Sequence, residues 1–403
     1  MQAQTDRGKN WMSDFLPAFR SNIRTSVLAA ALLLISMAGC LADHDAVSDP
    51  APRSAGQMLP DMLAISPASI TVSGLSSGGF FAHQFHISFS SRIAGAGIVA
   101  GGPFGCVDIV DNPFWPFVRL DRLSAALVAC THYLGSRYWG LHPDPPKAED
   151  AMNLIRAAHR SGEIDDPQNL RNDRVWLFHG PRDNLVPATV GQSLIDLYQN
   201  LGIDSEALKI GIGDPAQPAN HGMPVAKSGF DSRFPPRTCG DHLPPFIIEC
   251  GFGATRLMLD HLYPDPTASE PVDAHQNGEL RAFDQSIFFA SSATSSLSPV
   301  GYIYVPTACL AHECRLHIAF HGCQQNVDAQ GEERIHDDFI RDAGYNGWAA
   351  ANRTVVLYPQ ATQTSVNPNA CWDFWGYSGA GWRSRAGVQM RAVDAMIARL
   401  LDE

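Results

Sequence analysis

The stretch Gly74-Leu75-Ser76-Ser77-Gly78 is a G-x-S-x-G sequence between a β-prone run and an apolar, helix-like run. Strand, tight turn and helix in this order are the setting in which a serine nucleophile is presented. The turn holds the serine in a strained backbone conformation, and the flanking glycines remove Cβ atoms that would clash with the neighbouring chain. Ser76 is therefore the candidate nucleophile, although ordinary Gly/Ser turns also show this short pattern.

Strand-like and helix-like runs alternate along the rest of the chain. Short β-prone runs occur at residues 175–178, 301–305, 315–320 and 354–358, and helical periodicity occurs at 188–201, 335–352 and 387–401. This alternation predicts an α/β fold with a mostly parallel sheet. The stretch 263–299 contains many Pro, Asp and Ser residues and is expected to be a long connection within one catalytic domain.

A serine hydroxyl needs a histidine base and an acid that orients this base. Asp183 follows the strand-like run 175–178, and His221 lies in a Gly- and Pro-rich loop further along the chain. The order nucleophile, acid, histidine is that of α/β-hydrolases. Asp183 is therefore the candidate acid and His221 the candidate base. The alternatives are an Asx turn or helix cap for Asp183 and a solvated loop histidine for His221.

The run 315–320 leads into His321-Gly322-Cys323. In α/β-hydrolases a strand that ends in His-Gly precedes the nucleophile and donates a backbone N–H to the oxyanion. Here it follows the candidate histidine, so the expected fold is a circularly permuted α/β-hydrolase. The expected oxyanion donors are the amides of Ser77 and Cys323, with His321 bracing the loop. The alternative is a strand end with no catalytic role.

The N-terminal region predicts export. A basic flank containing Arg20 and Arg24 precedes the apolar run 27–39, which is too short to span a bilayer comfortably. Residues 1–39 are predicted to be a signal peptide, Cys40 a lipidated cysteine in a lipobox, residues 40–60 the anchor and tether, and 61–403 a single catalytic domain. The alternative is a plain signal peptide and a secreted protein.

The amino-acid composition limits the classes of protein to which the chain can belong. The 403 residues are 45% hydrophobic and 17% charged, with a net charge of −12. Such a chain can bury a large core, and it offers no basic excess for binding nucleic acid. Neither C-x-x-C nor H-E-x-x-H occurs, so no metal site and no cofactor are predicted.

Cysteine usage also indicates an exported protein. Nine cysteines are present, and setting Cys40 aside leaves eight, enough for four disulfides in an oxidising compartment. Eight cysteines allow 105 pairings. The short separations favour two pairs, Cys239–Cys250 and Cys309–Cys314.

Four sequence blocks carry a family resemblance. They are the serine box, the Asn-His-Gly-Met-Pro loop, the strand ending in His-Gly-Cys-Gln-Gln, and Cys-Trp-Asp-Phe-Trp-Gly-Tyr at 371–377. In combination they resemble the single-domain, circularly permuted polyhydroxybutyrate depolymerases, over residues 65–400. The resemblance implies hydrolysis of poly(3-hydroxyalkanoate) ester bonds, with the triad and oxyanion residues at the positions named above. It also implies a substrate groove near Trp372, Phe374 and Trp375, whose alternative role is core packing.

Two other functions remain compatible with the sequence. A feruloyl or acetylxylan esterase would share the serine box, because the sequence does not specify the leaving group. A lipoprotein binding module on a hydrolase scaffold would be a non-enzymatic use of the same fold. The expected partner is a polyester or oligoester, with membrane contact only through the lipid anchor.

Overall fold

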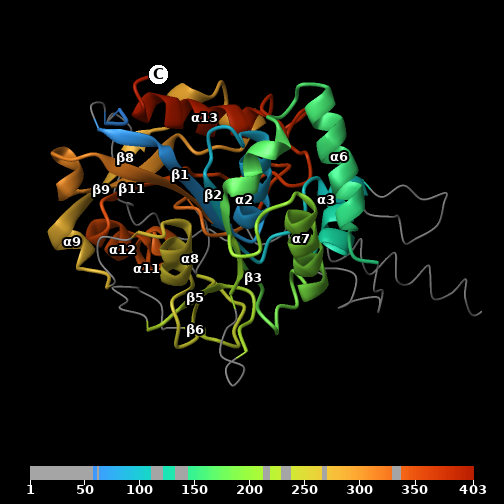
Figure 1. Ribbon diagram of the computed structural model, residues 1–403, viewed down its shortest axis with the longest axis horizontal. Helices are drawn as coiled ribbons and strands as arrows, with labels where there is room; N and C mark the ends of the chain where they lie inside the picture. The colour runs from blue at the N-terminus through green and yellow to red at the C-terminus, as the bar shows by residue number, and fades with distance from the viewer. Residues whose placement is uncertain are drawn as a thin grey trace, which may run out of the picture. The chain divides into compact units, whose positions relative to one another are not determined.

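The computed structural model describes residues 58–60, 63–109, 121–131, 144–211, 218–227, 237–265, 270–328 and 337–403 (Figure 1). All of them belong to one unit, Arg53–Glu403. The predicted signal peptide and Cys40 lie outside the described residues. Among the helices that are described, none combines the length and the apolar character needed to cross a bilayer.

The centre of the fold is a sheet with the strand order β4-β3-β2-β1-β10-β11-β9-β8. All neighbouring pairs from β4 to β11 are parallel, whereas β9 is antiparallel to both β11 and β8. In this order the strands are β4 (Leu208–Ile210), β3 (Arg174–Phe178), β2 (Gly95–Val99), β1 (Ile65–Leu75), β10 (Cys314–Phe320), β11 (Thr354–Tyr358), β9 (Val300–Pro306) and β8 (Gly278–Asp284).

This strand order confirms the predicted permutation. If the chain is read from β8, through β9, β10 and β11, and then back to β1 through β4, the sheet runs 1-2-4-3-5-6-7-8. Only the second strand of that series is then antiparallel, which is the α/β-hydrolase arrangement. In this chain the strands that begin such a sheet therefore come last in the sequence.

Helices cover both faces of the sheet (Figure 1). Both faces of the sheet are apolar and each packs in its own hydrophobic core. In β3, for example, Val175 and Leu177 belong to the first core, and Trp176 and Phe178 belong to the second. Strands buried on both faces need nearly continuous apolar sequence, as the buried β2 shows. The first core packs on α2 (Ser77–Ser88), α6 (Ala148–Arg160), α7 (Ala188–Asn200) and α13 (Val388–Leu400); the second packs on α8 (Ala254–Leu262) and α12 (Tyr345–Ala351).

A small second sheet and several short helices complete the described structure. The small sheet has the order β5-β7-β6 and is parallel, and β5 (Met223–Val225) begins two residues after His221. The remaining elements are β6 (Arg237–Thr238), β7 (Ile247–Glu249), α3 (Cys106–Ile109), α4 (Arg122–Ala125), η2 (Ala126–Cys130), η3 (Pro167–Asn172), α9 (Ala274–Asn277), η4 (Ser286–Phe288), α10 (Ser292–Ser295), η5 (Thr307–Leu310) and α11 (Asp338–Asp342).

Two sequence predictions need correction. The expected helix 335–352 is two helices, α11 and α12, because Gly344 between them has a φ of 88°, a left-handed conformation that interrupts a helix. The expected connection 263–299 contains the edge strand β8. This strand escaped prediction because, apart from Phe283, its residues are not fully buried, so it has no apolar run.

Four disulfides are present. Both pairs predicted from short separations, Cys239–Cys250 and Cys309–Cys314, are confirmed. The other two are Cys106–Cys130 and Cys323–Cys371. These last two join residues 24 and 48 positions apart, so their pairing depends on the tertiary structure.

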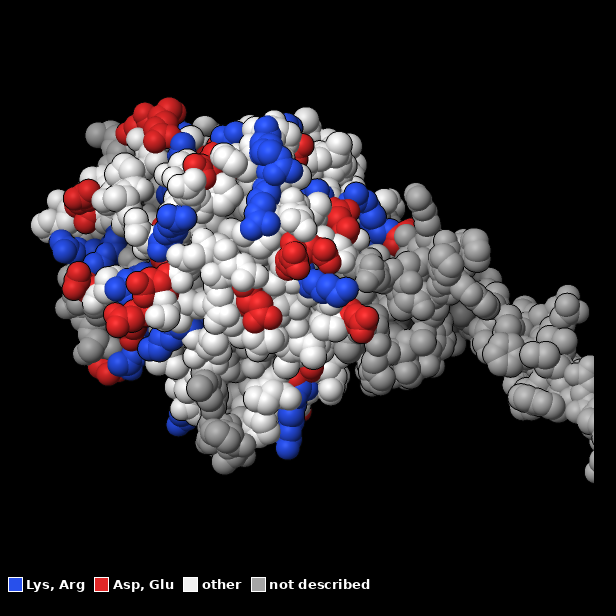
Figure 2. Space-filling model, turned by 45° about the vertical axis from the view of Figure 1, so that its right-hand side comes forward, with Lys and Arg blue, Asp and Glu red and all other residues white. Residues whose placement is uncertain are grey.

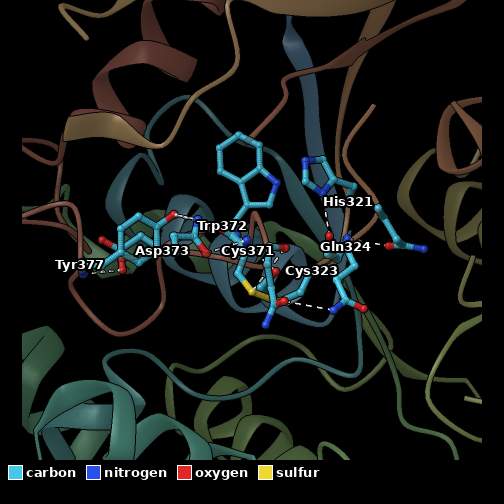
Figure 3. The surroundings of a disulfide bond; sticks show 12 residues. His321, Cys323, Gln324, Cys371, Trp372, Asp373 and Tyr377 are labelled. Carbon is cyan, nitrogen blue, oxygen red and sulfur yellow. Dashed lines mark hydrogen bonds between the residues drawn. A yellow bond between two sulfur atoms is a disulfide. The ribbon is translucent and has the colours of Figure 1, made fainter. Parts of the chain in front are cut away.

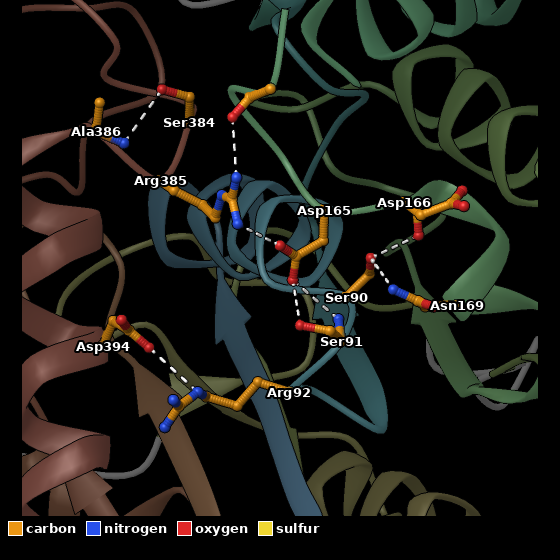
Figure 4. A network of polar contacts seen from close by, with 11 residues as sticks. Ser90, Ser91, Arg92, Asp165, Asp166, Asn169, Ser384, Arg385, Ala386 and Asp394 are labelled. Atoms are coloured by element: carbon orange, nitrogen blue, oxygen red, sulfur yellow. Dashed lines mark hydrogen bonds and ion pairs between the residues drawn. The ribbon is translucent and has the colours of Figure 1, made fainter. Parts of the chain in front are cut away.

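A polar network holds the C-terminal segment against the chain that follows α2 (Figure 4). Asp165 accepts hydrogen bonds from the backbone N–H and the hydroxyl of Ser91, and it forms an ion pair of 2.7 Å with Arg385. Arg92 pairs with Asp394 of α13 at 3.3 Å. Single exposed ion pairs contribute little to stability, but a shared network fixes the position of α13 more firmly.

The described surface carries both signs of charge. On the face shown in Figure 2, acidic and basic side chains are interspersed among uncharged residues. The full chain has a net charge of −12, so its composition gives no support for electrostatic binding to a polyanion.

Candidate active site

Ser76 occupies the sharp turn between β1 and α2. Its backbone has φ 57° and ψ −122°, a combination that L-residues rarely adopt. Its N–H donates to the carbonyl of Val99 at 2.9 Å, and its carbonyl accepts from Phe80 N–H in the first turn of α2. The serine therefore sits in the strained strand-to-helix turn expected from the G-x-S-x-G pattern.

The two flanking glycines are required by close backbone contacts. A Cβ on Gly74 would lie 2.2 Å from the carbonyl oxygen of Gly78. A Cβ on Gly78 would lie 2.3 Å from the carbonyl oxygen of Phe320 at the end of β10. Only glycine allows the turn to close and α2 to start this close to β10.

Asp183 and His221 form a buried pair. Asp183 lies in the loop after β3, and its Oδ2 is 2.8 Å from His221 Nδ1. Its Oδ1 accepts the backbone N–H groups of Leu185 and Val186, at 2.9 and 2.8 Å. A carboxylate can only accept, so Nδ1 of His221 carries a proton and Nε2 is the nitrogen able to take one.

Asp183 remains ionised in this setting. Burial by itself would raise its pKa, but the interactions with His221 and the backbone N–H of Val186 act in the opposite direction, and the pKa is lowered overall. An ionised carboxylate next to a histidine orients the ring and stabilises its protonated form.

The loop that carries His221 is held by backbone bonds. Asn220 accepts the His221 N–H on its Oδ1 at 2.8 Å, and its Nδ2 donates to the carbonyl of Gly240 at 2.9 Å. The Asn220 N–H donates to the carbonyl of Cys239, which the disulfide ties to Cys250. The sequence pattern includes Asn220 in the Asn-His-Gly-Met-Pro block but predicted no role for it, although its place directly before the candidate base was a usable signal.

The loop after β10 lies beside Ser76. β1 and β10 are parallel neighbours, and Gly74 is in register with Phe320. A Cβ on Gly322 would lie 3.5 Å from the Cβ of Ser76. Within the described part of the chain, no hydrogen bond uses the backbone N–H of Ser77 or of Cys323.

A disulfide joins this loop to the segment before α13 (Figure 3). Cys323 is bonded to Cys371, and Gln324 N–H donates to the carbonyl of Asn369 at 2.7 Å. The side chain of Gln325 accepts Gly322 N–H at 2.6 Å. The sequence pattern predicted neither this pairing nor a role for Gln325, because both depend on contacts that the pattern does not reveal.

The three aromatic residues of the 371–377 block occupy different environments. Trp372 has no exposed surface and packs against Phe81 and Phe320, with ring centroids 4.7 and 5.0 Å apart. Trp372 therefore packs in the core, which was the alternative role expected for these aromatic residues. Phe374 and Trp375 are each 6% exposed and lie edge to face at 5.0 Å.

Buried Asp373 shapes this aromatic segment. Its Oδ1 accepts the backbone N–H groups of Trp375, Gly376 and Tyr377. Its Oδ2 accepts both the N–H and the hydroxyl of Ser378. Burial raises the pKa of Asp373 despite these hydrogen bonds.

Two other histidines are also buried, but their surroundings differ from those of His221. Burial lowers the pKa of His179 to about 4, although the charge of Asp183 acts in the opposite direction. His321 is fully buried, and both of its ring nitrogens face backbone groups. Of these three histidines, His221 is the one hydrogen-bonded to a carboxylate, that of Asp183, among the described contacts.

The sheet order and the strained serine turn after β1 show that the chain has a circularly permuted α/β-hydrolase fold. No protein-family model matches it. It is 32% identical over 380 residues to a poly(3-hydroxybutyrate) depolymerase of Delftia acidovorans, covering 92% of this chain and 65% of that protein. It is 27% identical over 352 residues to a polyhydroxybutyrate depolymerase of Talaromyces funiculosus, covering 84% of this chain and 91% of that protein.

Solved structures agree with these relatives. A PHB depolymerase complexed with an R3HB trimer superimposes with a TM-score of 0.69 at 26% identity, covering 86% of this chain and 99% of that one. A PHB depolymerase from Penicillium funiculosum gives a TM-score of 0.68, also at 26% identity and with the same coverage. The chain is thus similar to polyhydroxybutyrate depolymerases in both sequence and fold. It spans 65% of the length of the Delftia relative, less than two thirds of that protein.

Proposed function

We propose that this protein is a serine esterase that hydrolyses the ester bonds of short-chain poly(3-hydroxyalkanoates), polyhydroxybutyrate or its oligomers. The observation that carries the proposal is the buried Asp183–His221 pair, in a fold that also presents Ser76 on a strained turn. The names of the relatives and of the structure with a hydroxybutyrate trimer support the substrate class.

The proposed reaction uses Ser76 Oγ to attack the ester carbonyl carbon while His221 Nε2 takes the hydroxyl proton. The tetrahedral oxyanion accepts hydrogen bonds from the amides of Ser77 and Cys323. The protonated histidine then gives its proton to the leaving alkoxide, which departs as the hydroxyl end of the product. Water, deprotonated by His221, attacks the acyl carbon of the acyl-enzyme. The bond to Ser76 Oγ then breaks, His221 returns the proton to Oγ, and the acid product leaves.

We assign the apolar wall of the substrate groove to Phe374 and Trp375. Phe374 stacks on Phe80 of α2 with ring centroids 4.6 Å apart, and Phe80 N–H donates to the carbonyl of Ser76. This chain of contacts leads from the aromatic pair to the serine turn. Methyl-bearing acyl units would contact such rings with about 25 cal/mol gained for each Å² of apolar surface removed from water.

The test is a substrate panel with Ser76→Ala as the matched inactive variant. The purified protein is incubated with (R)-3-hydroxybutyrate trimer, methyl ferulate and acetylated xylan, and acid release is followed by pH-stat. We expect release from the trimer by the wild type and a loss of about 10⁴-fold or more in the variant. Preference for the ferulate or xylan ester would instead identify a carbohydrate esterase. Absence of both hydrolysis and organophosphate labelling at Ser76 would indicate a binding module.

We further propose that the protein is exported and anchored through Cys40. Its four disulfides fit an oxidising compartment, and the residues before Cys40 match a lipobox. Cys40→Ser should abolish labelling by radioactive palmitate and release an active protein from the membrane fraction. Equal labelling of both forms, or none in the wild type, would leave a plain secreted protein.

A further inference from the structure

His321 is held between two backbone groups. It follows β10 and is fully buried, with Nδ1 2.7 Å from the carbonyl oxygen of Gly322 and Nε2 3.1 Å from the amide nitrogen of Ala361 (Figure 3). No carboxylate takes part in either contact, so His321 is not arranged as a second triad histidine.

The two partners determine the tautomer. A backbone N–H can only donate, so Nε2 must accept the bond from Ala361. A carbonyl can only accept, so Nδ1 must carry the proton and donate it to Gly322. Burial keeps the ring neutral, since it lowers the pKa of His321 to about 4.

The carbonyl that His321 binds belongs to the peptide unit of a proposed oxyanion donor. The C=O of Gly322 and the N–H of Cys323 lie in one peptide plane. Among the described residues the one cis peptide bond is Pro244–Pro245, so the Gly322–Cys323 peptide is trans. In a trans peptide the C=O and the N–H point in opposite directions. A hydrogen bond that fixes the carbonyl direction therefore fixes the direction of Cys323 N–H. It also polarises the peptide, which strengthens the N–H as a donor.

Neighbouring contacts prevent this peptide from rotating freely. Gln325 N–H also donates to the carbonyl of Gly322 at 3.3 Å, while its side-chain Oε1 accepts Gly322 N–H. The Nε2 of Gln325 donates to the carbonyl of Pro245 at 2.7 Å. On the other side, Trp372 packs against the His321 ring with centroids 5.8 Å apart. Because Gln325 contributes the longer bond to the carbonyl, the short bond from His321 is the stronger constraint.

We propose that His321 is a positioning residue for the oxyanion. Its neutral Nδ1–H tautomer holds the Gly322–Cys323 peptide so that Cys323 N–H faces the oxygen of the tetrahedral intermediate at Ser76. The inference rests on the proposed function, since it assigns a role within that reaction.

Two isosteric variants separate positioning from folding. In His321→Asn the side-chain amide nitrogen takes the place of Nδ1 and can still donate to Gly322, but the bond from Ala361 is lost. In His321→Gln the side-chain oxygen takes the place of Nε2 and accepts from Ala361, but the Gly322 carbonyl loses its short bond. Each variant loses one hydrogen bond, so similar falls in Tm are expected.

The readouts are kcat and KM on the hydroxybutyrate trimer and the rate at which an organophosphate modifies Ser76. We expect His321→Gln to lose about 10²-fold in kcat, in line with the loss of one oxyanion donor, with KM little changed. The organophosphate rate should fall in parallel, and His321→Asn should stay within a few-fold of wild type on both readouts.

The organophosphate measurement keeps the two proposals distinguishable. If the wild type is labelled at Ser76 but does not cleave the trimer, the proposed substrate is wrong, and the labelling rates of the two variants still test His321. If the rate of Ser76 labelling falls equally in both variants, in proportion to the fall in Tm, His321 has only a structural role and the inference is overturned. If Ser76 is not labelled in the wild type, both proposals fail.

Discussion

Mild acid should destabilise this protein strongly because several of its histidines are buried in neutral form. Burial lowers the pKa of His179 and His321 to about 4 and that of His317 to about 3. His317 lies between β1 hydroxyls, with its ring nitrogens 2.7 Å from the hydroxyl oxygens of Thr71 and Ser73. Protonation of any of these rings requires either unfolding or the loss of such contacts.

The direction and size of the effect follow from proton linkage. Between pH 6.5 and about pH 4 the unfolded chain binds protons at these three histidines and the folded chain does not, so stability falls as the pH falls. From pH 7 to pH 5 each histidine removes about 1.8 kcal/mol, and the three together remove roughly 5 kcal/mol. This is comparable with the whole free energy of unfolding of many domains, about 5–15 kcal/mol. Asp373, whose pKa is raised by burial, acts in the opposite direction.

The assay is urea unfolding followed by circular dichroism at several pH values between 7 and 5, with the disulfides intact. His179, His317 and His321 should together contribute between two and three protons taken up on unfolding to the slope of the unfolding free energy against pH near 5.5, and His83, whose pKa burial also lowers, adds to this uptake. His317→Gln should reduce that uptake by about one proton, whatever its effect on absolute stability. A wild-type slope below one proton would refute the reasoning, because the histidines would then titrate alike in both states.

Three further predictions concern the site and its supports. Gly78→Ala should abolish activity and lower stability by about 1–3 kcal/mol or more, since its Cβ would meet the Phe320 carbonyl at 2.3 Å; an active variant of normal Tm contradicts this packing. Asp183→Asn should lower kcat by up to about 10⁴-fold with a much smaller effect on KM, and unchanged kinetics would remove it from the proposed triad. Cys371→Ser, which opens the 48-residue link to Cys323, should lower the urea-derived unfolding free energy by about 4 kcal/mol and reduce kcat. Wild-type kcat in that variant would show that the loop keeps its position without the disulfide.

Short-range patterns in the sequence predicted much of the architecture. The runs 175–178, 301–305, 315–320 and 354–358 form β3, β9, β10 and β11, and 188–201 and 387–401 form α7 and α13 with ends shifted by about a residue. The turn at Ser76 and the pairs Cys239–Cys250 and Cys309–Cys314 were also readable. In each case the deciding interactions join residues close in sequence, so a local pattern is enough to predict the element, turn or disulfide.

Tertiary structure decided what depends on distant segments. The parallel register of β1 with β10 brings Gly322 beside Ser76, although 246 positions separate them in the chain. It also decided that Cys323 pairs with Cys371 and that Trp372 is buried. The tautomer of His321 depends on Ala361, which follows a different strand. A residue pattern records which side chains are available, but strand order and register determine which of them meet.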